Sequence, residues 1–523
     1  MKTKYLYIYL LGLLSIIAIT GCEDRLNILK QGNLGAEDGF YKTDEDTEQA
    51  LANLYYSLHD MYFNWYFTKN LLADDVWTGG GSRGDNSSME RLNEYNFGTD
   101  HAMVEQLYAS MYTVIYNANL IIGKIEMDTD IKKRAVSEAK FFRAWAHFEL
   151  VTMFGTAPVV DHLLEPSEYR QGNGNPETTW AFIEKDLNDA IASGSLPSKN
   201  DVNDKETGIR ITKEVAQAYL GKAQLFQGKY SEAAVTLDKV IESGKYDLYQ
   251  NGFDMLLHAV ADNNCESMLE IQMRNDPEKI WDVFTMTHIM QGWRTDKLNY
   301  SSDIKTYIAS GTYGFVNPRK ELYDAFVAME GKDGYRLNCT MRTYAQMKEA
   351  GITLQSGAYL YGSEGYFMWK NRPLKEDCVM DFSAFQALQY TNLRIMRYAE
   401  VLLMAAEAHV QGGGSQTKAL KYINEVRTRA HLPILSTVSL DDIKKEKRLE
   451  LCLEDVRYQD LIRWGDASTV LAEQGKDIPS FSEAGIEYLN HNTVYGFTDK
   501  NKLLPIPAKE LLVNPNMAQN KGW

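Results

Sequence analysis

The sequence lacks the short motifs that bind metals, nucleotides or redox partners. It contains no His-Glu-x-x-His, no Cys-x-x-Cys and no phosphate-binding loop. Basic residues are also fewer than acidic ones: the chain has 55 lysines and arginines and 71 aspartates and glutamates, which gives a formal net charge of −16. Nucleic acid and anionic lipid headgroups both require a basic surface. We therefore expect no metal, no cofactor, no nucleic-acid partner and no docking on lipid through a basic patch.

One hydrophobic run lies at the N-terminus and is too short for a comfortable membrane span. Leu6–Ile19 follows two lysines and ends in Ile19-Thr-Gly-Cys22, with a small residue directly before the cysteine. A transmembrane helix needs about 20 apolar residues, whereas this pattern is typical of a bacterial lipoprotein signal. We predict that residues 1–21 are removed, that Cys22 carries the lipid, and that residues 22–38 form a tether. The alternative is an ordinary secretory signal with an incidental cysteine.

Cysteine is scarce, with five residues in the chain. If Cys22 is lipidated, four cysteines remain, and an envelope location permits three alternative sets of disulfides. Cys452 lies on a predicted helix face, which indicates a buried thiol. A disulfide between Cys339 and Cys378 is one pairing that the sequence allows and does not decide.

Two patterns suggest hydrolases and are rejected. Gly80–Gly84 fits Gly-x-Ser-x-Gly, but a nucleophile elbow needs a buried strand before it and a helix after it, and the flanks here are polar and glycine-rich. Asp74 and Asp75 are adjacent, so their side chains should point apart, whereas a glycosidase needs carboxylates facing each other across a cleft. We therefore predict a protein without catalytic residues.

Helical periodicity dominates both halves of the chain. Leu393–Val410 places apolar residues at steps of three and four, and Ala419–Ala430 repeats that period after a Gly-Gly-Gly break. Ser439 and Asp442 have the spacing of a helix cap before a third helix, whose apolar stripe continues to Val456. Leu220–Glu242 closely follows a tetratricopeptide repeat, whose helices bury their faces only by stacking. These patterns predict a mostly α fold built from antiparallel helix pairs.

Four blocks of sequence resemble the SusD/RagB family. They are the run from Arg397 to Glu407, the run from Ala419 to Ala430, the run from Lys447 to Gly465 with Asp460-Leu-Ile-Arg-Trp-Gly465, and the closing Leu504-Pro-Ile-Pro507 with Asn514–Asn520. The resemblance implies a SusD-like fold in which tetratricopeptide-like helix pairs carry a loop-rich ligand lobe. It also implies a surface-exposed outer-membrane lipoprotein that passes nutrients to a SusC-like TonB-dependent β-barrel transporter.

Composition and the resemblance together divide the chain. Residues 39–244 are expected to form an N-terminal SusD-like helical region with the tetratricopeptide-like repeat, and residues 393–523 the C-terminal SusD/RagB region. Between them, residues 245–392 lose the helical period and are rich in glycine and aromatic residues, as is the earlier stretch 73–86. Loop-rich inserts on a rigid scaffold usually carry function.

Aromatic and polar residues within these inserts are the candidates for ligand binding. Sugar rings pack on aromatic faces, and their hydroxyls need fixed polar partners. The candidates are Trp77, Arg83, Asp85, Asn86, Trp293, Arg294 and Tyr300. For each tryptophan the alternative is a purely structural role in the core. The resemblance implies that loops of these two regions contact the ligand.

We therefore expect a protein that captures an oligosaccharide or polysaccharide at the cell surface and delivers it to the transporter. A peptide ligand is the alternative within the same family, and an envelope glycoside hydrolase is a less favoured alternative of another class. A scaffold that binds only proteins would show no affinity for small ligands.

Overall fold

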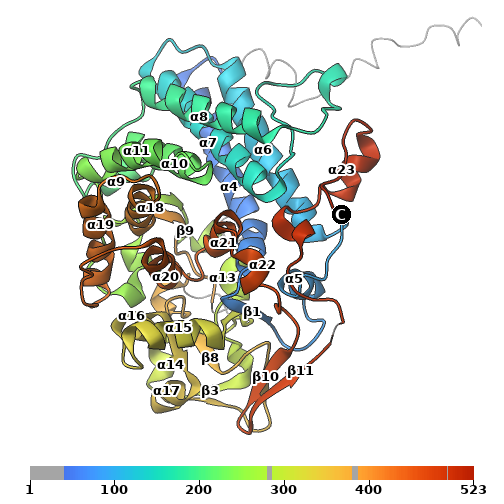
Figure 1. The fold of residues 1–523 in the computed structure, drawn as a ribbon, viewed down its shortest axis with the longest axis vertical. Coiled ribbons are helices and arrows are strands. Elements are labelled where there is room, and N and C mark those ends of the chain that lie inside the picture. The colour runs from blue at the N-terminus through green and yellow to red at the C-terminus, as the bar shows by residue number, and fades with distance from the viewer. Residues whose placement is uncertain (1–39, 280–284, 380–386, 492) are drawn as a thin grey trace, which may run out of the picture.

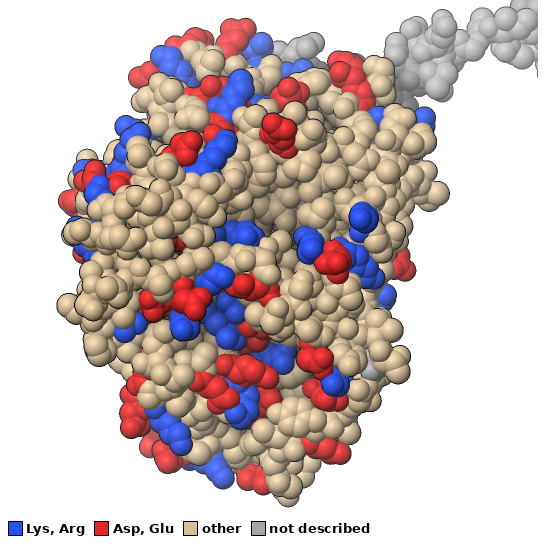
Figure 2. Space-filling view, in the orientation of Figure 1, with Lys and Arg blue, Asp and Glu red and all other residues tan. Residues whose placement is uncertain are grey.

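The structure is a computed structural model that describes residues 40–279, 285–379, 387–491 and 493–523. Long helices fill one end of the molecule, and short strands and short helices fill the other (Figure 1). The longer helices are α4 (Asp44–Leu71), α6 (Ala102–Lys124), α7 (Asp130–Phe154), α8 (Pro176–Ala192), α10 (Lys213–Phe226), α11 (Tyr230–Glu242), α18 (Tyr398–Gln411), α19 (Gln416–Arg429), α20 (Leu440–Glu450) and α21 (Arg457–Trp464). On the face drawn in Figure 2, Lys and Arg side chains lie among Asp and Glu side chains rather than in one large basic patch.

Helix α4 is the longest helix of the described residues, with 28 residues from Asp44 to Leu71. A capping box starts it, because Thr43 Oγ1 accepts from the Asp46 amide and Asp46 Oδ2 accepts from the Thr43 amide, both at 3.0 Å. The helix continues well past residue 60 because Trp65, Phe67 and their neighbours are buried against α6 and α7. Its last turns are apolar on most sides, so the one-sided period that marks a surface helix is absent there.

The tetratricopeptide-like pair α10–α11 packs closely. A Cβ atom on Gly221 would lie 2.5 Å from Leu237 Cγ, so only glycine allows this approach of the two helices. Helix α18 continues the stack against α11, and His409 Nε2 lies 3.0 Å from Asp238 Oδ1 across that contact. The alanines of α18 are fully buried, and their small side chains let neighbouring helices approach closely.

The structure corrects two boundaries in the C-terminal half. Residues 393–397 are not helical but form strand β9 (Leu393–Arg397), which pairs antiparallel with β2 (Ser267–Ile271). Helix α20 starts at the predicted cap, with Asp442 N donating to Ser439 Oγ at 3.2 Å, but it ends at Glu450. Leu453 and Asp455 then adopt positive φ. This turn brings the Glu454 carboxylate to within 3.0 Å of the buried Arg397 guanidinium, an ionic contact that outweighs the helical pattern.

The described strands form five small antiparallel sheets, of which the β2–β9 pair lies among the helices (Figure 1). Their pairs are β1 (Val76–Gly79) with β4 (Phe315–Pro318), β2 with β9, β3 (Leu298–Tyr300) with β6 (Ile352–Leu354), β5 (Met341–Thr343) with β8 (Tyr366–Met368), and a three-stranded sheet in the order β11 (Gly485–Leu489), β10 (Ile478–Ser482), β7 (Tyr359–Tyr361). The remaining α-helices of the described residues are α5 (Ser87–Asn93), α9 (Lys205–Gly208), α13 (Met286–Met290), α14 (Ile304–Tyr307), α15 (Lys320–Glu330), α16 (Tyr335–Thr340), α17 (Tyr344–Glu349), α22 (Ala467–Val470) and α23 (Ala508–Val513).

Two hydrophobic cores support this arrangement. The larger core runs through the helices and reaches the C-terminal segments. The smaller core lies among the short strands and contains Trp293, Tyr344, Leu360 and Phe367. The irregular region is therefore packed around its own interior, and the three-stranded sheet rests on it through Leu360 and the partly buried Phe481.

Candidate functional site

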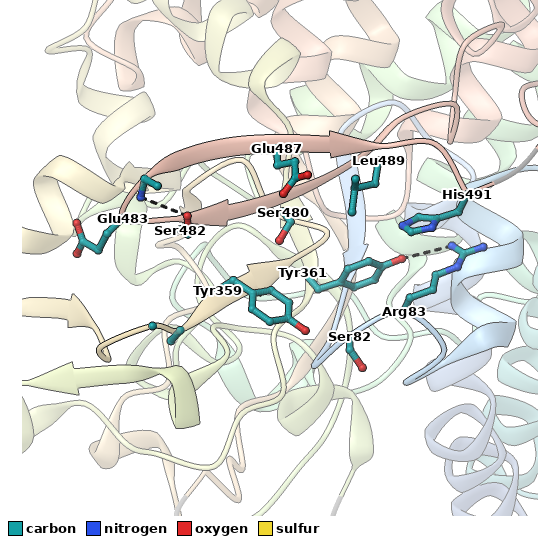
Figure 3. Close-up of a pocket in the computed structure, with 13 residues that line it drawn as sticks. Ser82, Arg83, Tyr359, Tyr361, Ser480, Ser482, Glu483, Glu487, Leu489 and His491 are labelled. Carbon is teal, nitrogen blue, oxygen red and sulfur yellow. Dashed lines mark hydrogen bonds between the residues drawn. The ribbon is translucent and has the colours of Figure 1, made fainter.

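A pocket of about 730 Å³ opens between the three-stranded sheet and the loop that follows β1 (Figure 3). Ligand pockets of proteins commonly measure roughly 300–1,000 Å³. Its lining residues come from three separate parts of the chain: Ser82 and Arg83; Gly357, Ala358, Tyr359 and Tyr361; and Ser480, Ser482, Glu483, Ala484, Glu487, Leu489 and His491.

The pleat of the sheet decides which side chains face this pocket. In an antiparallel ladder, directly paired residues share one face and alternate residues point the opposite way. Ser480 pairs with both Tyr361 and Glu487, so these three side chains form a row on the pocket face. The intervening Phe481 faces the small core, where its ring meets Tyr344 edge-on at 5.1 Å between ring centroids. The pocket floor is therefore a polar and aromatic sheet face with a packed apolar back.

The opposite wall is a glycine-rich loop, residues 80–86, between β1 and α5. Gly79 and Gly80 both have positive φ, and a Cβ atom on Gly79 would lie 2.1 Å from the Gly314 carbonyl oxygen. The loop is closed by Asp85, whose Oδ2 accepts from the Gly81 amide at 2.7 Å. Asn86 Oδ1 accepts from the Met89 amide at 3.1 Å and so caps α5. The side-chain oxygen of Asn86, a predicted binding residue, is therefore engaged in capping α5.

Arg83 is the predicted site residue that lines the pocket. Its guanidinium makes a two-point ion pair with Glu94, with Nη2 to Oε2 at 3.1 Å, and Nη1 donates to the Tyr361 hydroxyl at 3.3 Å. Burial raises the pKa of Tyr361 to about 12. The phenol therefore stays protonated at neutral pH, and because it accepts from Arg83, its own O–H can donate to a bound molecule.

Trp77 does not present its ring to a ligand, which corrects the expectation of direct stacking. It is 3% exposed, and its Nε1 donates to Glu364 Oε2 at 2.9 Å. The Arg319 guanidinium carbon lies 3.9 Å from its ring centroid. Trp77 packs with Tyr361 in a small buried cluster. Its place in the structure is behind the pocket floor.

Trp293 is likewise a core residue, because it is 1% exposed. Its Nε1 donates to the Met368 carbonyl at 3.0 Å, and its ring stacks on Trp369 at 5.6 Å between centroids. Every polar and aromatic contact of this side chain is thus made inside the protein. Both tryptophans therefore have the structural role in the core that the sequence analysis gave as the alternative to ligand binding.

Arg294 brings the two predicted regions together beside the pocket. Its Nη1 lies 3.3 Å from Asp85 Oδ2, and its Nε lies 2.7 Å from Asp296 Oδ1. Tyr300 is not part of this group: it is half-buried on β3, its hydroxyl is enclosed with no hydrogen-bond partner among the described residues, and burial raises its pKa. The structure therefore joins Asp85 with Arg294 and places Tyr300 away from the pocket lining.

The residues that sequence reasoning missed are mostly on the three-stranded sheet, above all Tyr359, Tyr361 and Glu487. Two signals were available. Tyr359-Leu-Tyr361 alternates, and residues 478–482 and 485–489 flank a short turn, which is the pattern of a hairpin. Neither signal shows which distant strand joins the hairpin, and that pairing creates the pocket.

The local structure around Ser82 also corrects one argument against a hydrolase. A buried strand, β1, does precede this serine, and helix α5 follows it. Within the described residues, no hydrogen bond links Ser82 to His491, the imidazole of the same pocket. The Asp74–Asp75 pair is buried and tied to arginines, with Asp74 Oδ1 2.8 Å from Arg457 Nε and Asp75 Oδ1 2.9 Å from Arg448 Nε. These aspartates hold the scaffold together.

The remaining predictions, on cysteines, metals and membrane spans, can be compared with the described part of the chain. There, Cys265, Cys339, Cys378 and Cys452 are all free thiols, and Cys452 is buried as predicted. No cluster of three or more His, Cys, Asp or Glu side chains in those residues is arranged to hold a metal ion. Of the helices that the structure describes, none is both long and apolar enough to span a membrane. Cys22 and residues 1–38 lie outside the described ranges.

Comparison with known proteins identifies the family. A model described as SusD family matches residues 383–523, and a model described as starch-binding and associating with the outer membrane matches residues 36–225. SusD-like protein P2 of Formosa agariphila is 25% identical across 99% of this chain and 100% of its own length. The chain belongs to the SusD/RagB family. The starch-binding protein SusD of Bacteroides thetaiotaomicron is also 25% identical, across 84% of this chain and 82% of its own.

Solved structures confirm the mostly α SusD fold. A laminarin binding SusD-like protein superposes with a TM-score of 0.77 at 29% identity, covering 92% of this chain and 100% of that one. Surface glycan-binding protein A from Bacteroides thetaiotaomicron, in complex with laminarihexaose, gives a TM-score of 0.73 at 22% identity over 91% of this chain and 99% of that one, which supports the fold alone. Residues 226–382 lie between the two matched SusD-family stretches and include β7. The pocket thus combines segments inside and outside the family models.

Proposed function

We propose that this SusD-family protein binds an oligosaccharide or polysaccharide in the pocket between loop 80–86 and the β7–β10–β11 sheet, and that it passes this glycan to a SusC-like TonB-dependent transporter. The observation that carries the proposal is the sheet face itself. It presents an exposed tyrosine ring beside hydroxyls and carboxylates. Such a surface suits a ligand with an apolar ring face and many hydroxyl groups.

Tyr359 supplies the apolar contact. Its side chain is 44% exposed on the pocket face (Figure 3), and the exposed Leu489 extends the apolar surface on β11. The polar contacts come from Glu487, which can accept hydrogen bonds from sugar hydroxyls, and from the Tyr361 hydroxyl, which can donate one. The ion pair between Arg294 and Asp85, which belongs to loop 80–86, adds further polar groups beside the pocket.

The relatives favour a glycan over a peptide. One similar structure is named as laminarin binding, and a curated relative is named as starch-binding. Those names describe the relatives. They agree with the chemistry of the pocket in this chain.

Cys22 supplies the proposed anchor, and it would hold the protein in the outer membrane with its helices and pocket exposed at the cell surface. Confinement to the membrane raises the effective concentration of the protein near a membrane-embedded partner. The extended surface of the stacked helices is the part expected to contact the barrel.

Binding and hydrolysis are separated by one experiment on the purified protein. Calorimetric titration with laminarin and soluble starch should show binding, while an assay for new reducing ends should stay at background. Tyr359→Ala should weaken binding by roughly 1–3 kcal/mol, the loss expected for an aromatic anchor. Tyr307→Ala is the matched control, because Tyr307 is 43% exposed and does not line the pocket.

If Tyr359→Ala binds the glycan with unchanged affinity, the proposed location of the binding site in this pocket is wrong. New reducing ends in proportion to protein concentration would instead establish a hydrolase.

A further inference from the structure

The charges around the pocket are unevenly balanced. Glu487 projects from the β10–β11 hairpin beside Ser480 on the pocket face, whereas the Glu483 side chain lies at the end of the hairpin and points away from the other labelled side chains (Figure 3). Glu483 has Tyr344 and, at 3.9 Å, Lys348 as partners. Glu487 is exposed, and among the described residues it has no ion-pair partner.

The cations near the pocket are already neutralised by the protein. Arg83 is held by Glu94 and lies 3.5 Å from Glu90 Oε2. Arg294 is shared between Asp85 and Asp296. Among the described residues that line the pocket, no lysine or arginine is left with an uncompensated charge. His491 is the remaining basic side chain of the lining.

This balance has different consequences for neutral and acidic sugars. A carboxylate accepts hydrogen bonds from the hydroxyls of a neutral sugar, and charge-assisted bonds of this kind are stronger than neutral ones. A uronate or sulfate ester on the glycan would instead meet the carboxylate of Glu487 with the same sign of charge. Recognition of an anionic group normally uses an arginine fork or an unpaired lysine, and each nearby arginine already holds a carboxylate of the protein.

We propose that the pocket selects neutral glycan chains and rejects chains carrying carboxylate or sulfate groups, with Glu487 as the side chain that sets this preference. The inference rests on the proposed function, because it assigns the class of glycan taken by the same pocket. Glu487 shares a row with Ser480 and Tyr361 across the three strands, so a ligand that contacts the Tyr361 hydroxyl and Ser480 lies close to the Glu487 carboxylate.

The test compares neutral and acidic polysaccharides on the same purified protein at low and high salt. Laminarin and soluble starch are the neutral probes, and alginate and carrageenan are the uronate and sulfated probes. Wild type should bind a neutral probe with little dependence on salt and should bind neither anionic probe. Glu487→Lys should raise the affinity for an anionic probe relative to the neutral one by at least about tenfold at low salt, because a like charge is replaced by an opposite one.

Two variants control for other effects of the substitution. Glu487→Gln keeps the size of the side chain and one acceptor oxygen, so it should weaken neutral binding only by the difference between a charge-assisted and a neutral hydrogen bond, while reducing the penalty against alginate. Glu232→Lys makes the same change of net charge on an exposed position of α11, away from the pocket, and should behave as wild type.

The outcomes separate the two proposals. Wild-type protein that binds alginate or carrageenan as tightly as a neutral probe overturns the neutral preference while leaving glycan binding intact. So does a Glu487→Lys variant that keeps its neutral binding with an unchanged ratio of affinities. Failure of wild type to bind any of the four polysaccharides would count against the proposed function itself.

Discussion

At the scale of single residues, burial divides the aromatic side chains into those that support the pocket and those that can contact a ligand. Trp293 is enclosed in the small core, whereas Tyr359 is open on the sheet face. Trp293→Ala should lower the free energy of unfolding by about 3–5 kcal/mol, the usual loss for a large buried ring. Urea unfolding followed by circular dichroism measures this change.

The same measurement separates the two roles that the sequence allowed for Trp293. A variant that unfolds at the wild-type urea concentration but binds glycan weakly would restore the direct contact. A variant that is destabilised and binds normally when folded would confirm the core role.

His147 makes the stability of the protein depend on pH. It is buried on α7, where the Val160 amide donates to Nε2 at 3.2 Å and Nδ1 lies 2.8 Å from the Arg143 carbonyl, an arrangement that suits the neutral ring. Burial lowers its pKa from 6.5 to about 4. The unfolded chain therefore binds more protons between these values, and stability present above pH 6.5 is lost as the pH falls toward 4.

The expected contribution of His147 is roughly 1.4 kcal/mol for each pH unit inside that window. His147→Gln removes the titrating group and should flatten the dependence of the unfolding free energy on pH between 6.5 and 4. An identical slope in wild type and variant would show that this histidine titrates alike in the folded and unfolded states.

At the scale of elements, buried ion pairs attach α15 and α16 to helix α20. Arg336 on α16 is completely buried and contacts Glu446 and Glu450 on α20 at 2.7 and 3.1 Å, together with Glu330 on α15 at 2.8 Å. Removing one partner of a buried ion pair leaves charges without compensation. Because the partners come from separate elements, the network fixes how α15 and α16 sit on α20.

Arg336→Met should therefore lower the free energy of unfolding by roughly 3–5 kcal/mol. Lys509 provides the contrast, since its ion pair with Glu105 is at the surface and its side chain is 78% exposed. Lys509→Met should change stability by no more than about 1 kcal/mol. Equal effects of the two substitutions in guanidinium unfolding would mean that the buried network adds nothing beyond a surface pair.

At the scale of the whole molecule, the proposed anchor and partner are tested together in cells. Cys22→Ala should abolish incorporation of labelled fatty acid and release the protein from the outer membrane, because lipid chains provide the stable attachment. Gentle solubilisation of wild-type membranes, followed by affinity purification, should recover a TonB-dependent barrel with this protein. A contact of that kind should bury well over about 1,000 Å².

Labelled fatty acid in the Cys22→Ala variant would refute the lipidation site. Repeated recovery of the protein alone, from cells grown on the bound glycan, would refute the complex and leave a free-standing surface binder.

The helical scaffold could be predicted from the sequence because helix periods and helix caps depend on residues that are close together in the chain. The tetratricopeptide-like pair and the cap at Ser439 follow from glycine, alanine and capping residues close together in the chain. The failures occurred where a distant partner overrides the local pattern. Residues 393–397 look helical but pair with β2, and the end of α20 is set by an ion pair to Arg397.

The helix pairs could be predicted from the sequence because they are encoded in the spacing of neighbouring residues, and four sequence blocks were enough to indicate the family. The tertiary structure decided which aromatic residues are available to a ligand. Trp77 and Tyr361 belong to segments nearly three hundred positions apart, yet they pack together, and only their packing leaves one behind the pocket and the other in its lining. Exposure depends on which distant strands meet, and the pairing of β7 with β10 is a long-range contact that no local pattern specifies.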